Sequence, residues 1–251
     1  MSERDTLFAG DGVGTEIPGF AFDSAVASVF PDMIRRSVPG YADLVGLTGI
    51  AAAAFARTGS RCYDLGCSRG ASTFAVADAA YSAGVSDFEV VAVDSAPAMI
   101  ERLKGSLDAW TRGKRGVRVT PLLSDVMDVG ITDASVVVAN YTLQFVSKSR
   151  RLELVERIFD GLLPGGALIL SEKIVFASPA EEALASGLHE AFKKANGYSE
   201  LEIARKRSAL ENVLVPETAE EHLRRLEDVG FQTVWRWFQS LNFVSWIAVK
   251  E

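Results

Sequence analysis

The stretch over residues 62–72, which reads CYDLGCSRGAS, most constrains what this chain can fold into. It predicts a short buried strand ending at Leu65, a turn that contains Gly66 and Gly70, and a helix over residues 71–80. Glycine in such a turn permits positive φ and lets a ligand approach the backbone closely. The first N–H groups of the helix can bind polar ligand atoms. This stretch therefore predicts a strand, turn and helix unit that holds a small ligand.

The kind of ligand follows from two carboxylates near this turn. Asp94 ends the next apolar run, EVVAVD, where a nucleotide-binding β-α-β unit places the carboxylate that binds ribose hydroxyls. The turn lacks the third-glycine spacing of GxGxxG, and Asp64 on its strand would repel a pyrophosphate but attract an ammonium group. These features favour S-adenosylmethionine over a dinucleotide. A plainer interpretation of Asp64 is that it only caps the turn.

The remaining apolar segments predict an α/β fold. Strands are expected at Phe88–Asp94, Val117–Leu123, Ala134–Asn140 and 167–172, with helical or loop segments between them. Such alternation indicates a doubly wound, mostly parallel sheet of Rossmann-like type with helices on both faces. The runs FQTVWRWF and FVSWIAV near the C-terminus predict an antiparallel hairpin at the sheet edge.

A single domain over residues 1–251 accounts for this pattern, because 48% of the residues are hydrophobic and can fill a sizeable core. We expect a helical arm at residues 1–58, in which a first helix ends before Pro31. A second addition, an inserted pair of helices at residues 178–212, is expected to cap the carboxyl ends of the strands.

Composition excludes several classes of function. No run approaches the roughly 20 apolar residues of a membrane span, and the N-terminus does not resemble a signal peptide, so a cytoplasmic location is expected. The net charge of −7 disfavours direct binding of nucleic acid and favours a small-molecule substrate. Cys62 and Cys67 have neither zinc-site nor redox spacing, and His189 and His222 are expected to be partly exposed helix residues. No metal site is predicted.

In an open α/β sheet the ligand lies beyond the carboxyl ends of the strands. Asp94 would there accept the ribose hydroxyls, Asp125 the adenine amino group, and the turn amides would face the amino-acid part of the ligand. Residues that directly follow the predicted strands are Gly66, Cys67, Ser68, Asp94, Ser95, Ser124, Asp125, Val126, Asn140 and Tyr141.

A basic tract in the second inserted helix contains Arg205, Lys206 and Arg207. One interpretation is a solvated face that pairs with nearby glutamates. The other is that one of the three side chains points into the site and binds a carboxylate. The charge pattern alone does not choose among them.

Several longer motifs occur together and in order along nearly the whole chain. They are PDMIRRSVPGY, YDLGCSRG, APAMIER, TLQF, PGGALILSEK and ANGYSELEI. Together they resemble the bacterial carboxy-S-adenosyl-L-methionine synthase family. The first and last motifs are far more specific than the glycine turn, which ordinary methyltransferases share.

This resemblance implies a class I methyltransferase fold, usually homodimeric, whose chemistry is not methylation. Members of this family are transferases with two substrates, S-adenosylmethionine and prephenate. They convert these to carboxy-S-adenosylmethionine and phenylpyruvate. The product then supplies a partner enzyme that modifies the wobble uridine of transfer RNA. In that chemistry a closed pocket protects a deprotonated sulfonium methyl from water while it captures carbon dioxide.

The resemblance also assigns roles by motif position. Arg207 would bind the carboxylate that forms on the methyl carbon, which decides among the three basic residues. Three parts of the chain depart from the family pattern. They are Ser95, where asparagine is more usual, Arg69, and residues 10–20. Cofactor contacts are assigned to Tyr41, Gly66, Cys67, Ser68, Asp94, Ser95, Asp125, Val126 and Asn140.

Two alternatives belong to other functional classes. An ordinary methyltransferase acting on a small molecule or RNA would need the same fold and cofactor residues. A catalytically silent cofactor-binding subunit is the third possibility, and the joint presence of Tyr41, Asp94, Asn140 and Arg207 weighs against it.

Overall fold

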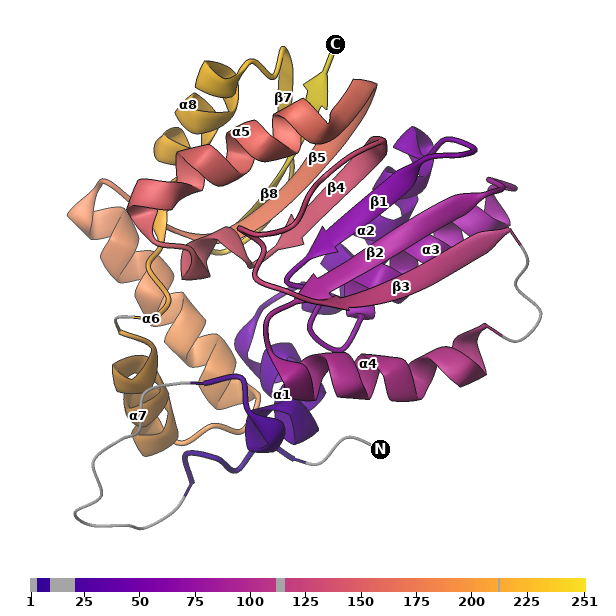
Figure 1. The fold of residues 1–251 in the computed structure, drawn as a ribbon. Helices are drawn as coiled ribbons and strands as arrows, with labels where there is room; N and C mark the ends of the chain where they lie inside the picture. Colours follow the sequence, from indigo (N-terminus) through magenta and orange to yellow (C-terminus); the bar gives the residue numbers. More distant parts are fainter. Residues whose placement is uncertain (1–3, 10–20, 112–115, 212) are drawn as a thin grey trace.

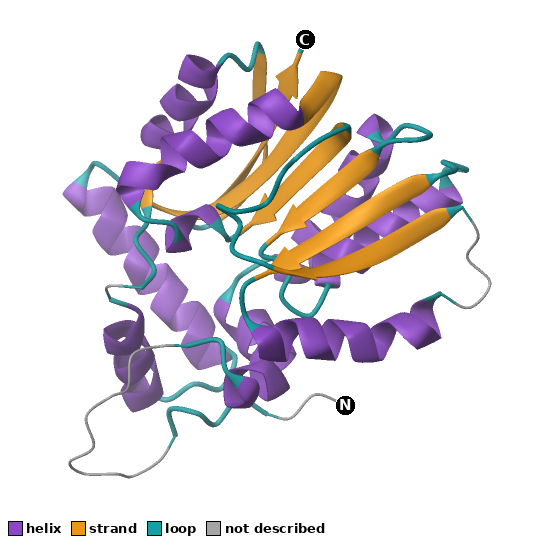
Figure 2. Cartoon of the chain, in the orientation of Figure 1, coloured by secondary structure: helices purple, strands orange, loops and turns teal. Residues whose placement is uncertain are grey.

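A mixed sheet of eight strands forms the centre of the computed structural model, which describes residues 4–9, 21–111, 116–211 and 213–251 (Figures 1 and 2). The strand order is β3-β2-β1-β4-β5-β8-β7, and β6 pairs with β5 outside this order. Strands β1 to β5 run parallel, β8 is antiparallel to β5, and β7 is antiparallel to β8. This topology confirms the predicted fold class. The strands are β1 (Arg61–Leu65), β2 (Phe88–Asp94), β3 (Val117–Leu123), β4 (Ala134–Asn140), β5 (Leu162–Val175), β6 (Glu217–Thr218), β7 (Thr233–Ser240) and β8 (Phe243–Lys250).

Helices cover both faces of this sheet because the central strands are apolar on both sides. In β4, Val136 and Val138 pack with α2, α3 and α4, whereas Val137 packs with α5 and α8 on the other face (Figure 1). The remaining helices, α1, α6 and α7, lie at one end of the sheet. The helices are α1 (Ser24–Ser37), α2 (Tyr41–Phe55), α3 (Ala71–Ser82), α4 (Pro97–Trp110), α5 (Arg151–Gly161), α6 (Pro179–Ala195), α7 (Glu200–Leu210) and α8 (Ala219–Val229).

No single helix in the described ranges is long and apolar enough to cross a bilayer. Helices α1 and α2 reach the necessary length and apolar composition only together, and the two are bent by 98° relative to each other.

Helix α1 runs through Pro31, so the predicted end of the helix before this residue is wrong. A proline has no N–H and leaves the carbonyl four residues earlier without its helical donor. Here that carbonyl belongs to Ala27, and Arg69 Nη1 donates to it at 3.1 Å and to the Ser28 carbonyl at 3.4 Å. Arg69 of the glycine turn therefore supports α1. A further departure from the family pattern, residues 10–20, lies outside the described residues.

Both histidines are buried, which makes the expectation of partial exposure wrong. His222 on α8 is only 1% exposed and lies against the indole of Trp246 in β8, at 5.3 Å between ring centroids. His189 on α6 is 7% exposed, with Nε2 2.7 Å from the Ser37 carbonyl oxygen. Burial lowers the pKa of His222 to about 4 and that of His189 to about 3. Both rings are therefore neutral near pH 7.

The His222→Gln variant should lose part of the acid sensitivity of the fold. Below its ordinary pKa of 6.5 His222 takes up a proton only in the unfolded chain, so the free energy of unfolding falls as pH drops toward about 4. The fall is about 1.4 kcal/mol per pH unit for each such histidine. Urea unfolding of both proteins across this range should show a shallower pH slope for the variant, with the His189 contribution remaining. Parallel slopes would contradict the assignment.

Candidate active site

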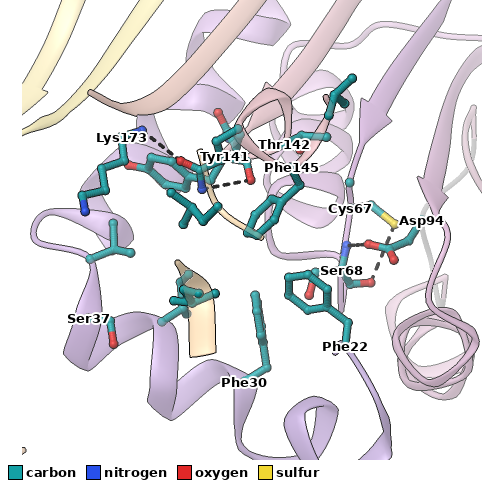
Figure 3. A pocket seen from close by; sticks show the side chains of 18 of the residues that line it. Phe22, Phe30, Ser37, Cys67, Ser68, Asp94, Tyr141, Thr142, Phe145 and Lys173 are labelled. Carbon is teal, nitrogen blue, oxygen red and sulfur yellow. Dashed lines mark hydrogen bonds between the residues drawn. The ribbon is translucent and has the colours of Figure 1, made fainter. Parts of the chain in front are cut away.

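A cavity of about 460 Å³ opens at the carboxyl ends of the parallel strands (Figure 3). It is within the size range of ordinary small-molecule sites. All nine predicted cofactor-binding residues line it. They are Tyr41, Gly66, Cys67, Ser68, Asp94, Ser95, Asp125, Val126 and Asn140.

Gly66 shapes the turn at one wall of the cavity. Its φ is +74°, and a Cβ atom there would lie 2.3 Å from Thr142 Oγ1, so a side chain cannot be accommodated. Thr142 Oγ1 in turn donates to the Leu65 carbonyl at 2.7 Å. The amides of Gly66 and Cys67 both donate to the Val93 carbonyl at 2.9 Å. These contacts fix the turn against β2.

The amides of this turn do not meet the expectation that they face the amino-acid part of the ligand. Besides the two that bond β2, the Ser68 amide donates to Asp94 Oδ2 at 2.8 Å. These three N–H groups therefore stabilise the turn itself, and the turn lines the cavity without offering them to a ligand. Burial raises the pKa of the Cys67 thiol, which keeps it protonated and unsuited to act as a nucleophile.

Asp94 links the turn to the start of α4. Its Oδ2 accepts the Ser68 amide and its Oδ1 accepts the Ala96 amide, both at 2.8 Å. Each carboxylate oxygen has a second acceptor position, so Asp94 can also accept ribose hydroxyls. Burial raises the pKa of Asp94, and the two amides oppose this rise. The arrangement fits the nucleoside part of S-adenosylmethionine.

Asp125 and Asn140 are held in different ways at the same edge of the sheet. Asp125 Oδ1 accepts the Met127 amide at 2.8 Å, and its other oxygen has no hydrogen-bond partner among the described residues. It can accept an adenine amino group. Asn140 donates to Ser72 Oγ at 2.9 Å and accepts from Ser171 Oγ at 2.6 Å. These bonds fix the orientation of the Asn140 amide at the end of β4.

Asp64 does not line the cavity. It is 1% exposed, and it accepts a hydrogen bond of 2.5 Å from the Thr73 hydroxyl in α3. Burial raises its pKa to about 7. The structure thus favours a structural role for Asp64, as in the plainer interpretation, but its hydrogen bond is to the helix after the turn.

Aromatic residues form a wall that sequence reasoning missed. The rings of Phe22 and Phe145 meet edge to face at 5.4 Å, with Phe30 beside Phe22 at 6.3 Å (Figure 3). Tyr141 lines the cavity as well, as its position at the end of a predicted strand indicates. Its hydroxyl is buried and has no hydrogen-bond partner among the described residues. No sequence pattern predicts that Phe22 and Phe30 of the N-terminal arm lie close to residues that follow β4.

Positive side chains form the end of the cavity away from Asp94, and His189 lies among them. Lys173 comes from β5, Lys193 from α6 and Lys206 from α7. Figure 3 places Lys173 and Ser37 on the side opposite Cys67, Ser68 and Asp94. The strand-end rule could have identified Lys173, because this residue directly follows the strand predicted at residues 167–172. Lys193 is one of two adjacent lysines on a helix, and no sequence pattern indicates that its side chain lines a cavity.

Of the three basic candidates in α7, Lys206 is the one that lines the cavity. Arg205 Nη1 donates to the Phe8 carbonyl at 3.1 Å. The guanidinium of Arg207 pairs with Glu190, and its side chain is 65% exposed. The structure therefore does not bring Arg207 together with the cofactor-binding residues.

Comparisons with known proteins agree with this site. A family model described as a methyltransferase domain matches residues 63–166. A putative S-adenosyl-L-methionine-dependent methyltransferase of Methanococcus maripaludis has a similar fold, with a TM-score of 0.57 and 20% identity, over 96% of this chain and 97% of that one. The chain therefore has the fold of the S-adenosylmethionine-dependent methyltransferases.

Closer relatives define the family. A protein of Trichlorobacter lovleyi named carboxy-S-adenosyl-L-methionine synthase is 51% identical over 235 residues, which are 94% of each chain. One of Pectobacterium atrosepticum with the same name is 46% identical over 250 residues, covering 100% of this chain and 98% of the relative. The chain belongs to the carboxy-S-adenosyl-L-methionine synthase family, as its sequence motifs indicate.

The Asp94→Asn variant should bind S-adenosylmethionine about 10- to 100-fold more weakly, as expected for the loss of a charge-assisted hydrogen bond of about 1.5 to 3 kcal/mol. The new amide also cannot accept from both Ser68 and Ala96. Calorimetric titration measures the affinity, and circular dichroism checks the fold. The control is Asp43→Asn, an exposed residue of α2. Equal affinity of Asp94→Asn and wild type would contradict the assignment.

Proposed function

We propose that this protein converts S-adenosylmethionine and prephenate to carboxy-S-adenosylmethionine and phenylpyruvate. The observation that carries the proposal is the cavity with two unlike ends. One end has a carboxylate and turn suited to a nucleoside, and the other has three lysines suited to an anion. Prephenate is a dicarboxylate, and the names of the relatives supply the carboxylated product.

The proposed reaction balances without a further reactant. The bond between the prephenate ring and its ring carboxyl group breaks, and the ring becomes aromatic as its hydroxyl leaves as hydroxide. Hydroxide takes a proton from the sulfonium methyl, and that methyl carbon bonds the released carbon dioxide. Water and phenylpyruvate are the remaining products. No side chain of the cavity needs to act as the base.

The cavity must exclude water during this reaction. Arg36 of α1 supports closure, because Nε and Nη2 donate to the carbonyls of Asn196 and Gly197 at 2.7 and 2.8 Å, between α6 and α7. Its guanidinium also lies 3.9 Å from the ring centroid of Tyr198. We therefore propose one domain in which the arm at residues 1–58 and the inserted cap at residues 178–212 close the site together.

Arg207 is proposed to bind the carboxylate that forms on the methyl carbon. Support comes from the matching family motif and from its charge, which lowers the pKa of both Lys173 and His189. Contact with the product requires Arg207 to exchange Glu190 for the new carboxylate. Its role would be electrostatic stabilisation of the developing carboxylate.

The wider role is proposed from the same family. The product would supply a partner enzyme that modifies the wobble uridine of transfer RNA, which places the reaction in the cytoplasm. A homodimer is proposed as well. Trp235, on the edge strand β7, is 62% exposed and is one candidate contact. Sedimentation of the purified protein should give the mass of a dimer, and a monomer at all concentrations would contradict it.

Incubation with S-adenosylmethionine and prephenate should yield a nucleoside heavier by one carbon dioxide, together with phenylpyruvate. Mass spectrometry of reactions with and without prephenate measures both products. Unchanged S-adenosylmethionine in both reactions would contradict the proposal. Prephenate-independent formation of S-adenosylhomocysteine would instead identify an ordinary methyltransferase.

The Arg207→Leu variant should form the carboxylated product at least about tenfold more slowly, as expected when a charged hydrogen-bond donor to the developing carboxylate is lost. Affinity for S-adenosylmethionine should change little, because Arg207 does not line the cavity. Rate and calorimetric affinity are measured side by side, with Arg224→Leu on the exposed face of α8 as control. Equal loss of both quantities would make Arg207 a structural residue.

A further inference from the structure

Two lysines of the cavity have amino groups that bind nothing in the described structure. Lys173 and Lys193 both line the cavity, and neither has an ion pair or a side-chain hydrogen bond to any described residue. Lys206 differs, because its Nζ donates to Ser37 Oγ at 2.9 Å and lies 3.7 Å from Asp5 Oδ2. Arg150 also lines the cavity, but its guanidinium pairs with Glu153 at 3.2 Å. Among the described lining residues, Lys173 and Lys193 are therefore the cations available to a ligand.

The surroundings of these two lysines favour an anion. Burial and the charge of Lys173 lower the pKa of Lys193 to about 8, and the charge of Lys193 acts in the same direction on Lys206. Like charges held together in a partly buried site are unfavourable unless a negative group joins them. Among the described carboxylates, only Glu182 has a charge that supports the protonated form of Lys173.

An apolar surface lies beside the lysines. Phe243 meets the ring of Tyr141 edge to face at 5.7 Å and that of His189 at 5.1 Å. All three residues line the cavity, and burial keeps His189 neutral. A ligand that combines a carboxylate with a six-membered carbon ring fits this surface.

The reaction itself indicates which carboxylate the lysines hold. Prephenate has a ring carboxyl group, which leaves as carbon dioxide, and a pyruvyl carboxylate, which remains in phenylpyruvate. An ion pair with the ring carboxylate would stabilise the starting state and oppose loss of carbon dioxide. An ion pair with the pyruvyl carboxylate anchors the substrate through the whole reaction without this cost.

We propose that Lys173 and Lys193 bind the pyruvyl carboxylate of prephenate and thereby turn its ring carboxyl group toward the sulfonium methyl. The inference rests on the proposed function and adds the substrate-binding residues to it. It also gives α6 a second role, since the helix that covers the cavity supplies one of the two cations.

The test compares Lys193→Met and Lys173→Met with wild type. Each variant should raise the KM for prephenate at least tenfold, while calorimetric affinity for S-adenosylmethionine stays within twofold. Phenylpyruvate, which keeps only the pyruvyl carboxylate, should lose affinity for the S-adenosylmethionine-loaded variants by a similar factor. Lys193→Arg should recover part of the loss, because it restores the charge.

Lys194→Met is the matched control. Lys194 is the next residue of α6, but its side chain is exposed and pairs with Glu200 at 2.7 Å. This variant should bind prephenate and phenylpyruvate as wild type does. Lys193→Met and Lys173→Met with an unchanged KM for prephenate would overturn the inference.

The inference and the proposed function can fail separately. If wild type forms no carboxylated nucleoside, the proposed function fails, and titration with phenylpyruvate still tests the lysine site. Weaker phenylpyruvate binding by Lys193→Met than by Lys194→Met would then support an anion site at Lys173 and Lys193. Equal binding by the two variants would overturn it.

Discussion

The hydrogen bonds of the buried Arg36 guanidinium hold in place the inserted helices that line one end of the site. This side chain joins α1 to the turn between α6 and α7 through the carbonyls of Asn196 and Gly197, and it also contacts Asp32. A buried arginine is costly unless its donors are satisfied, so these bonds also specify where the turn lies. Together with the contacts of His189 and Lys206 to Ser37, this link holds α6 and α7 against α1, so that Lys193 and Lys206 lie in the cavity wall.

The cavity contains two kinds of electrostatic environment. Carboxylates at the ends of β2 and β3 suit the ribose and adenine of S-adenosylmethionine, while lysines from β5, α6 and α7 suit an anionic substrate. Between them lies an aromatic wall that includes Phe22 and Phe145. The methyltransferase fold alone accounts for the first environment. The inserted helices provide two of the three lysines of the second environment.

Sequence reasoning predicted β2, β3 and β4 to the residue, because each is a short apolar run bounded by polar or turn residues. Strand ends also located the cofactor side of the cavity, since parallel strands bring their carboxyl ends to one edge. Predictions from local sequence patterns were wrong where contacts with residues far along the chain determine the structure. Arg69 lets α1 pass through Pro31, and packing against α1 or β8 buries the two histidines. Lys193 was missed because a lysine on an amphipathic helix looks the same whether it faces solvent or a cavity.

Transfer of one particular carbon atom is the most direct test of this account. Prephenate labelled with a heavy carbon isotope only in its ring carboxyl group is mixed with the protein and unlabelled S-adenosylmethionine, and the nucleoside is analysed by mass spectrometry. The account predicts that the label appears in the nucleoside, on the carbon bonded to the former methyl group, while phenylpyruvate carries none. A carboxylated nucleoside without label, or label found only in free carbon dioxide and bicarbonate, would contradict it.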